Sequence, residues 1–332
     1  TKIAFQNDKI DLLKAESIGD LIHAETDLQR DQAVKLVQGN ASNYYNDLRE
    51  KLIKSLSYIE AKIDFAEDDL PEKVLKEAQN SIKNIHQDIK KILEDNKVGE
   101  KIRDGFKVSI TGEVNAGKSS LLNLIAKRDV AIVSDEAGTT RDVIETYLNI
   151  DGYPVILADT AGIRVAKNEV EKKGISLALG KSKEADLNIV VIDNSSKSVN
   201  NEIKKMINKD TIVLLNKSDV LDKQNHKFDA HTVLASVKEN KNIDSLIKKI
   251  KEKLSKKFTS NNTALITRER HRVKLNECLK EIDNFLKKDQ NKDLELAAED
   301  LRMATRHLGS IVGKVDVEEI LGSIFKDFCI GK

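Results

Sequence analysis

A nine-residue stretch, GEVNAGKSS at residues 112–120, constrains the fold more than any other part of this 332-residue chain. It follows the apolar run FKVSIT and precedes the helix-like LLNLIA, a strand–loop–helix context that is typical of phosphate-binding loops. Gly112 and Gly117 let the backbone bend and present N–H groups to phosphate oxygens, while Lys118 would neutralise phosphate charge and Ser119 would bind Mg²⁺. The stretch predicts a nucleotide-binding α/β domain, with ATP and GTP both open at this point.

Short β-branched runs, most of them separated by helical patterns, extend from residue 105 to residue 258. These runs are FKVSITG, VIETYLNI, YPVILADTAG, DLNIVVIDN, TIVLLNKSD and HTVLAS. Such alternation indicates a mainly parallel sheet with helices on both faces. Because only the dipeptide DG separates VIETYLNI from YPVILAD, we expect these two runs to form a β-hairpin.

The sequence NKSD at residues 216–219 narrows the choice of nucleotide. A carboxylate at Asp219 can accept hydrogen bonds from N1–H and the 2-amino group of guanine, and adenine offers neither donor. The order of the phosphate loop, GTTRD, DTAG, NKSD and ASVK along the chain therefore predicts GTP. The contacts expected from these motifs are Asn115, Ala116, Gly117, Lys118, Ser119, Ser120, Thr140, Asp159, Thr160, Ala161, Gly162, Asn216, Lys217, Asp219, Ser236, Val237 and Lys238, with Mg²⁺ held by Ser119, Thr140 and Asp159.

The flanks, residues 1–104 and 259–332, carry apolar residues at helical spacing. Pro71 is expected to begin a long helix, and Asp316 with Glu319 forms a capping pattern before a final helix. Because each flank needs a partner for its apolar faces, we expect the two flanks to pack on each other. The predicted fold is an α/β P-loop (Ras-like) G domain, residues 105–258, inserted into an all-α helical-bundle domain.

The residue that would orient the attacking water cannot be the one after DTAG, because Ile163 stands where Ras-type enzymes have glutamine. The nearby carboxylates are Asp142, Glu169 and Glu171. No obvious arginine finger exists beyond Arg141 or Arg164, so a substitute cation is required. Asn115, inside the phosphate loop, has a carbonyl oxygen that suits a monovalent ion.

The chain ends in FCIGK, which places Cys329 three residues from the last position. The Cys-x-x-x register allows a lipidation site, although Gly331 and Lys332 do not fit it well, and packing as a small apolar residue is the alternative. Lys+Arg (56) and Asp+Glu (55) nearly cancel, so any contact with RNA must be local. Two distant cysteines, with no signal peptide or membrane span, lead us to expect a cytoplasmic protein without a disulfide, a zinc site or a membrane partner.

The motifs together resemble the MnmE (TrmE) family of tRNA-modification GTPases. The likeness rests on FQNDKIDLLKAESIGDLI, GEVNAGKSSLLN, VSDEAGTTRD, DTAGIR, NKSD and the terminal FCIGK, and it covers essentially the whole chain. The resemblance implies a K⁺-activated GTPase whose G domains form a homodimer. It implies that K⁺ is held by Asn115, Ser134, Glu136 and Thr139, that Ser134 and Thr139 belong to the nucleotide site, and that Glu171 activates water with support from Arg141, Asp142 and Arg164.

The resemblance also implies a coupled reaction. In the family, GTP hydrolysis is linked to an FAD-containing partner of the MnmG (GidA) type, and a folate one-carbon donor supplies a group for carbon 5 of the wobble uridine of tRNA. Cys329 then matches a functional residue of the modification site, and Lys9 and Lys332 match positions that close over the folate. Family members begin with a folate-binding domain that precedes the part seen here, so folate binding is expected only of the complete family protein. Val114 also departs from the usual proline.

Two other classes of function stay open from the residues alone. A ribosome-assembly GTPase of the Era or Der type would need a KH-like RNA module, and the flanks show only helical patterns. A GTP-dependent switch without modification chemistry would use the helical flanks to contact a partner, and its turnover would be slow and insensitive to K⁺.

Overall fold

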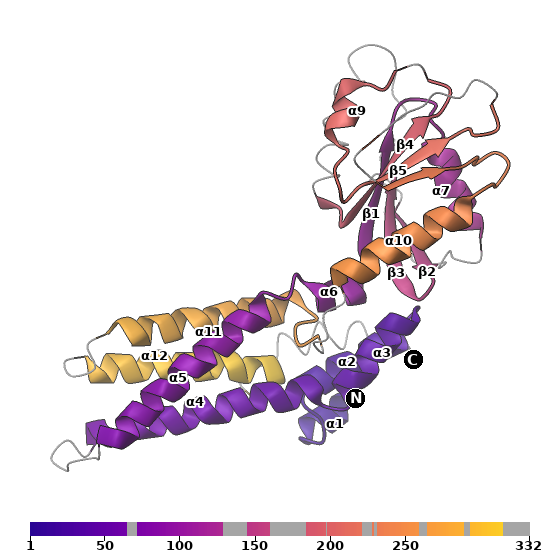
Figure 1. Cartoon of the computed structure of the whole chain (residues 1–332). Coiled ribbons are helices and arrows are strands. Elements are labelled where there is room, and N and C mark those ends of the chain that lie inside the picture. Colours follow the sequence, from indigo (N-terminus) through magenta and orange to yellow (C-terminus); the bar gives the residue numbers. More distant parts are fainter. Residues whose placement is uncertain are drawn as a thin grey trace, which may run out of the picture. The chain divides into compact units, whose positions relative to one another are not determined.

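The computed structural model describes residues 1–64, 72–128, 145–159, 184–196, 198–220, 228, 231–258, 264–288 and 293–314. Contacts divide the chain into two compact units (Figure 1). The helical unit comprises Thr1–Ala24, Gln29–Arg103 and Ser260–Lys332, and the sheet unit comprises Glu25–Leu28 and Asp104–Thr259. The sequence-based division placed the boundaries at 104/105 and 258/259 and assigned residues 25–28 to the helical part.

The helical unit is built from long amphipathic helices whose apolar faces meet. Its elements are α1 (Lys2–Gln6), α2 (Leu12–Ile22), α3 (Asp27–Val37), α4 (Asn40–Asp64), α5 (Glu72–Leu93), α6 (Val98–Asp104), α11 (Glu269–Lys287) and α12 (Leu294–Val312). The two predicted flanks do pack on each other, because α4 lies against both α5 and α12, and α11 lies against α12. Pro71 and the predicted helix after Asp316 lie outside the described residues.

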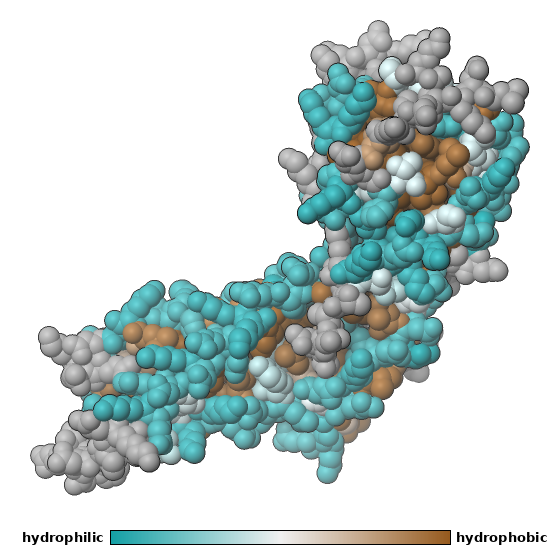
Figure 2. Space-filling model, viewed as in Figure 1, coloured by the Kyte–Doolittle hydropathy of each residue, from teal (hydrophilic) through white to brown (hydrophobic). Residues whose placement is uncertain are grey.

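One continuous core joins the helices from both flanks. Tyr45, Leu52, Ile85, Ile282 and Leu308 are among its fully buried members. Burial of each large aliphatic side chain contributes about 1.5–3 kcal/mol, which offsets the conformational entropy lost along such long helices. In the view of Figure 2 the outer surface of these helices is mainly hydrophilic. Cys278 packs in this core as a small apolar residue, and burial raises the pKa of its thiol.

The sheet unit contains six strands, β1 (Phe106–Gly112), β2 (Glu145–Ile150), β3 (Tyr153–Asp159), β4 (Leu187–Asp193), β5 (Ile212–Asn216) and β6 (His231–Leu234). Their order is β2-β3-β1-β4-β5-β6, and only the β2–β3 pair is antiparallel. That pair is the predicted hairpin. Asp151 and Gly152 form its turn with φ values of 53° and 91°, the positive values that a tight Asp-Gly hairpin turn requires.

Helices cover both faces of the sheet, as predicted (Figure 1). On one face, Val190 and Ile192 of β4 and Val213 of β5 pack with Ile203 of α9 (Asn201–Lys205). Neighbouring residues of these strands point to the other face and are also buried. There α10 (Ile243–Phe258) contacts β4 and β5, while α7 (Lys118–Lys127) contacts β1 and β3.

Because five of the strands run in parallel, their carboxyl ends meet at one edge of the sheet, which is where ligands bind in open α/β sheets. We call this edge the carboxyl edge. The turns after β1, β4, β5 and β6 all start there. Within the described ranges, no helix is both long enough and apolar enough to cross a lipid bilayer.

Candidate nucleotide-binding site

The phosphate loop connects β1 to α7 at the carboxyl edge. Gly112, Asn115 and Gly117 all have positive φ values, of 145°, 61° and 101°. These values turn the backbone sharply before the first turn of α7, whose N–H groups have no partner within the helix. Such a helix start favours a bound anion. The loop therefore has the geometry that its sequence predicted.

The three side chains that follow the loop, at the start of α7, differ in how they are held. The Nζ of Lys118 donates to the carbonyl oxygens of Gly112 at 2.9 Å and Glu113 at 2.6 Å, so the ammonium group is curled over the loop. Ser119 and Ser120, in the first turn of α7, are exposed. The Mg²⁺ role predicted for the Ser119 hydroxyl, at the first of these positions, stays a prediction.

Asn216, the first residue of NKSD, connects the phosphate loop to the segment 235–238. It stands at the end of β5 and is 3% exposed. Its Nδ2 donates to the carbonyl oxygen of Ala116 at 2.8 Å, and its Oδ1 accepts from the backbone N–H of Val237 at 3.0 Å. The two segments expected to hold opposite ends of the nucleotide are thus joined by one buried amide.

Asp219 is oriented by a serine from the following segment. The hydroxyl of Ser236 donates to Asp219 Oδ1 at 2.6 Å, and the same hydroxyl oxygen accepts from the backbone N–H of Glu239. The bond from Ser236 lowers the pKa of the Asp219 carboxyl. The carboxylate is therefore charged and fixed in direction, as recognition of guanine requires.

Lys217 is also held at the carboxyl edge, by a residue that sequence reasoning did not single out. Its Nζ lies 2.5 Å from Oδ2 of Asp193, and Asp193 Oδ1 accepts from the backbone N–H and hydroxyl of Ser195. Burial raises the pKa of Asp193, but the bonds from Lys217 and Ser195 outweigh it and the pKa is lowered. An aspartate directly after the apolar strand DLNIVVI was the sequence signal for this ion pair.

The structure brings together one part of the predicted site. Asn115, Ala116, Gly117, Lys118, Ser119, Asn216, Lys217, Asp219, Ser236, Val237 and Lys238 gather at the carboxyl edge. The backbone of Asp159 ends β3, and its neighbour in the sheet is Ile110 of β1, two residues before the phosphate loop. Ser134, Glu136, Thr139, Thr140, Arg141, Asp142, Thr160, Ala161, Gly162, Arg164, Glu171, Cys329 and Lys332 lie outside the described residues.

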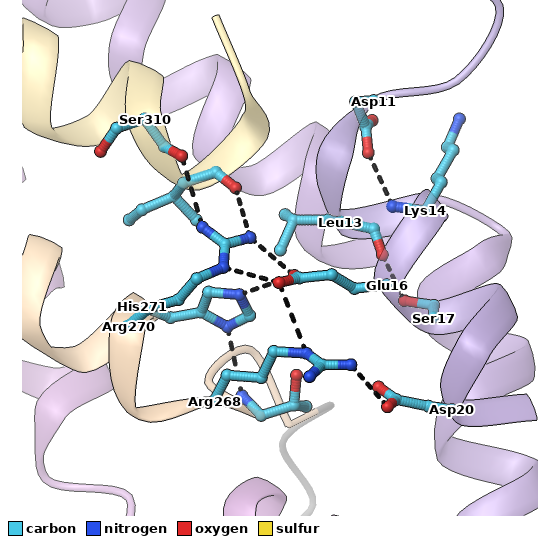
Figure 3. Close-up of polar contacts among 12 residues, drawn as sticks. Asp11, Leu13, Lys14, Glu16, Ser17, Asp20, Arg268, Arg270, His271 and Ser310 are labelled. Carbon is cyan, nitrogen blue, oxygen red and sulfur yellow. Dashed lines mark hydrogen bonds and ion pairs between the residues drawn. The ribbon is translucent and has the colours of Figure 1, made fainter. Parts of the chain in front are cut away.

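A second polar site, in the helical unit, was missed from the sequence (Figure 3). Glu16 of α2 is 3% exposed and accepts two bonds of 2.6 Å from Arg270, and a third of 3.1 Å from Nε2 of His271. The Nε2–H of His271 is the donor to Glu16, because its Nδ1 faces the backbone N–H of Thr267. Two features of the sequence could have indicated this cluster. One is the charged run RERHR at 268–272, and the other is a glutamate on an apolar helix face.

The ionisation of this buried cluster follows from its contacts. Burial opposes charge on Glu16, but hydrogen bonds from His271 and Arg270 outweigh this effect and the pKa of Glu16 is lowered. Burial lowers the pKa of His271 to about 4, against the opposing influence of Glu16. The cluster therefore contains a glutamate anion, charged arginines and a neutral imidazole.

Comparison with known proteins shows the family to which the chain is related. The family model described as the MnmE helical domain matches residues 12–329. The tRNA modification GTPase MnmE of Pelagibacter ubique is 58% identical over 338 residues, which span 100% of this chain and 75% of that protein. The MnmE of Rickettsia bellii strain RML369-C is 45% identical over 339 residues, with the same coverage.

A solved structure of the G domain of the T. maritima FeoB iron transporter is 25% identical, with a TM-score of 0.35, and covers 45% of this chain and 98% of that one. The family model matches most of this chain, and the two MnmE relatives are similar to it over its whole length. The chain belongs to the MnmE family of tRNA modification GTPases.

Proposed function

We propose that this chain hydrolyses GTP in a K⁺-stimulated reaction that is coupled to modification of carbon 5 of the wobble uridine in tRNA. Residues 105–258 act as the G domain, and residues 1–104 and 259–332 act as the helical domain. The observation that carries the GTP part is the joining of the phosphate loop to the guanine-reading segment by Asn216, with Asp219 held in place by Ser236.

In this proposal the phosphate loop also binds the monovalent cation. Asn115 has an exposed side chain at a positive φ of 61°, so its carbonyl oxygen is accessible beside the phosphate site. The K⁺ ligands are Asn115, Ser134, Glu136 and Thr139, and the Mg²⁺ ligands are Ser119, Thr140 and Asp159. A cation there replaces the charge of an arginine finger, which is worth on the order of 10³ to 10⁵ in rate.

The hydrolytic residues of the proposal are carried over from the family. Glu171 activates the attacking water, because Ile163 cannot. The supporting charged residues around Glu171 are Arg141, Asp142 and Arg164. GTP-loaded G domains form a homodimer, which encloses the cation and excludes bulk solvent while the attacking water stays beside the γ phosphate.

The modification half of the reaction uses the helical domain. The proposed partners of the chain are tRNA and an FAD-containing protein of the MnmG (GidA) type. The one-carbon donor is a folate that the complete family protein binds. Cys329 acts at the modification site. Lys9, exposed in the turn between α1 and α2, and Lys332 contact the folate. These substrates place the protein in the cytoplasm.

The experiment that tests this proposal is steady-state GTP hydrolysis in KCl and in NaCl at equal ionic strength. Oligomeric state is followed in GDP with aluminium fluoride. We expect faster turnover and dimers only in KCl, and we expect Glu171→Ala to bind GTP without hydrolysing it. Equal slow rates in the two salts, with a persistent monomer, would favour a GTP switch without modification chemistry.

A further inference from the structure

The helix α10, which contacts β4 and β5 (Figure 1), carries a strong excess of positive charge in its C-terminal half. Residues 248–256 contain five lysines and one glutamate, whereas the whole chain has a formal net charge of only +1. By contrast, α11 contains five basic and four acidic residues. Solvated helix faces usually mix the two signs in this way, because neighbouring opposite charges stabilise a helix. Solvation alone therefore does not account for the lysines of α10.

The helix dipole does not account for these lysines either. It favours positive side chains at the C-terminal end of a helix, but the effect falls off beyond the last turn. The charged run begins at Lys248, and α10 ends ten residues later at Phe258. Most of the run thus lies too far from the helix end to be explained by the dipole.

The apolar side of α10 fixes how its lysines are arranged. Its fully buried residues recur at three- or four-residue spacing and form the stripe that packs on the sheet; they are Ile243, Leu246, Ile250 and Leu254. Lys249, Lys253 and Lys256 follow one another at spacings of four and three residues along one flank of this stripe. We call these three residues the lysine row. At a rise of 1.5 Å per residue the lysine row is about 10 Å long.

The lysine row lies near the amino ends of the last two strands of the sheet. Nζ of Lys253 donates to the carbonyl oxygen of Lys209 at 2.6 Å, in the turn that leads into β5. His231, whose ring is also close to the lysine row, is the first residue of β6 and is paired in the sheet with Ile212, the first residue of β5. We call this the amino edge. Because the nucleotide motifs follow the carboxyl ends of the strands, the lysine row is separate from the GTP site.

Two titratable side chains beside the lysine row respond to its charge. The charge of Lys253, ahead of slight desolvation and the other two lysines of the row, lowers the pKa of His231. A bond of 3.1 Å from Lys249, supported by the charges of neighbouring lysines, lowers the pKa of the exposed Glu252. The carboxylate of Glu252 opposes the effect on His231 but is outweighed. The surface around the lysine row is therefore electropositive.

Lys251, on the opposite flank of α10, has a different environment. Its Nζ pairs with the carboxylate of Asp151, in the turn between β2 and β3. This lysine thus belongs to a contact within the sheet unit, and its charge is balanced there. Removing it would change the formal charge of α10 as much as removing one lysine of the row, without touching the row itself.

The chemistry of the lysine row suits phosphate groups. A lysine ammonium is a compact charge with three donors, and it binds phosphate as a point charge. Reading of bases requires stacking aromatic side chains or planar groups that form paired hydrogen bonds, and residues 248–256 contain neither. Contacts of lysine with the phosphate backbone position a nucleic acid without reading its sequence. A row about 10 Å long can face more than one backbone phosphate.

We propose that Lys249, Lys253 and Lys256 form a contact site for the phosphate backbone of tRNA on the sheet unit. This inference rests on the proposed function, in which tRNA is the polyanion that the chain acts on. The lysine row holds the substrate by charge and takes no part in GTP hydrolysis or in recognition of the wobble uridine. Because the row is at the amino edge, tRNA bound there leaves the carboxyl edge open to GTP.

Binding of a tRNA transcript with unmodified uridine at the wobble position, measured with the intact chain at several KCl concentrations, tests the inference. Each lost phosphate contact lowers the slope of log affinity against log salt by about 0.7 to 0.9. Lys249→Gln, Lys253→Gln and Lys256→Gln should each show this change, with affinity about 5- to 10-fold weaker at 0.1 M KCl. Arginine at the same positions should preserve binding, because it keeps the charge.

Two further variants distinguish the lysine row from a general effect of charge. Lys251→Gln removes the same charge from the same helix and should bind tRNA with the wild-type affinity and salt slope. Glu252→Gln removes the anion beside the row and should bind tRNA more tightly. GTP hydrolysis without tRNA should be unchanged in all of these variants, which also shows that they are folded.

The outcomes separate this inference from the proposed function. Wild-type affinity and slope in all three glutamine variants of the lysine row overturn the inference alone, as does an equal loss in Lys251→Gln. Vesicles of phosphatidylcholine and phosphatidylserine in equal parts provide a second anionic surface. If the lysine row is needed for binding to vesicles but not to tRNA, the row is a membrane contact and the inference is wrong. If the wild type binds no tRNA, the inference and the proposed tRNA partner both fail.

A second readout is the KM for tRNA in the modification reaction, measured with the complete protein, the flavoprotein partner and the folate donor. The glutamine variants of the lysine row should raise this KM and leave kcat unchanged, since the contact is far from the reacting groups in the proposal. An unchanged KM contradicts the inference. Absence of any wild-type product would instead contradict the proposed function, and the binding titration would still decide on the lysine row.

Discussion

Gly117 lies so close to Asn216 that a Cβ added to the glycine would be 2.3 Å from Nδ2 of the asparagine. A glycine at position 117 is required for two reasons, because its φ of 101° is also one that residues with a Cβ rarely adopt. The asparagine that joins the loop to the guanine-reading segment is therefore in place only if residue 117 has no side chain.

Gly117→Ala should abolish measurable GTP binding, because the loop or Asn216 must move. Gly152→Ala is the matched control. Gly152 also has a positive φ, 91°, but its added Cβ would meet nothing closer than Asp27 Cβ at 3.9 Å. This control should lose some stability and keep its affinity for GTP. Fluorescent-nucleotide titration distinguishes the two variants, and normal binding by Gly117→Ala would contradict the role given to the close contact.

Asn216→Ala should weaken binding of both GDP and GTP. It removes the donor to Ala116 and leaves the buried N–H of Val237 without a partner. Each buried group left unpaired costs about 1–3 kcal/mol, so we expect an affinity loss of about 10- to 100-fold. Calorimetric titration checks this value. Asn208→Ala, which removes side-chain bonds to Asp210 and Thr211 in another loop of the sheet unit, should bind nucleotide normally.

Asp219→Asn should change the preferred base. The amide replaces the carboxylate that accepts from the two guanine donors, and xanthine offers an oxygen where guanine has its amino group. Competition between XTP and GTP for the site measures the change. Ser236→Ala, which leaves the carboxylate but removes its 2.6 Å bond, should lower GTP affinity while keeping the preference for guanine. A retained GTP preference in Asp219→Asn would refute this assignment.

The stability of the helical unit should fall between pH 6.5 and pH 5 because of His271. Its folded-state pKa is lowered to about 4 from the ordinary 6.5, so in this range the unfolded chain takes up a proton that the folded chain does not. Unfolding is therefore favoured as pH falls, by about 2 kcal/mol over this interval. The lowered pKa of Glu16 acts in the same direction, but only at lower pH.

Urea denaturation followed through helical-unit signals at pH 7 and pH 5 measures this effect. His271→Gln should be less stable than the wild type at pH 7 and should lose less stability on acidification. Ser17→Ala, which removes a neutral bond to the carbonyl of Leu13 on the same helix, should retain the wild-type pH dependence. Parallel pH dependence in His271→Gln and the wild type would rule out the histidine as its source.

Cys329→Ser should separate the two halves of the proposed reaction. The substitution is far in sequence from the nucleotide motifs, so GTP hydrolysis should continue at the wild-type rate. Because a hydroxyl is a much weaker nucleophile than a thiolate, modified wobble uridine should be absent from the product tRNA. Mass analysis of digested tRNA detects it. If the serine variant still gives modified wobble uridine, Cys329 has no role in the modification, and packing or lipid anchoring remains as its role.

Much of the sheet unit was predictable because its signals are local. Strand runs, the Asp-Gly turn and the phosphate loop each act through residues within a few positions of one another, where backbone preferences decide the outcome. The same holds for the spacing of apolar residues in α4, α11 and α12. For these elements, the pattern in the sequence and the structure agree.

The hydrogen-bond and ion-pair partners of the polar side chains could be identified only from the tertiary structure. Asn216 meets Ala116 across 100 positions, and Arg270 meets Glu16 across 254. No local pattern encodes which carboxylate will face which arginine, because that choice depends on how helices from both ends of the chain pack. The sequence alone determined that this chain has a GTP-type loop and helical flanks. Packing decided that Asp219 is oriented by Ser236 and that one carboxylate, Asp20, accepts from both Arg103 and Arg268. The physical reason is that periodicity reports burial of a face, while pairing of buried charges requires the three-dimensional positions of both partners.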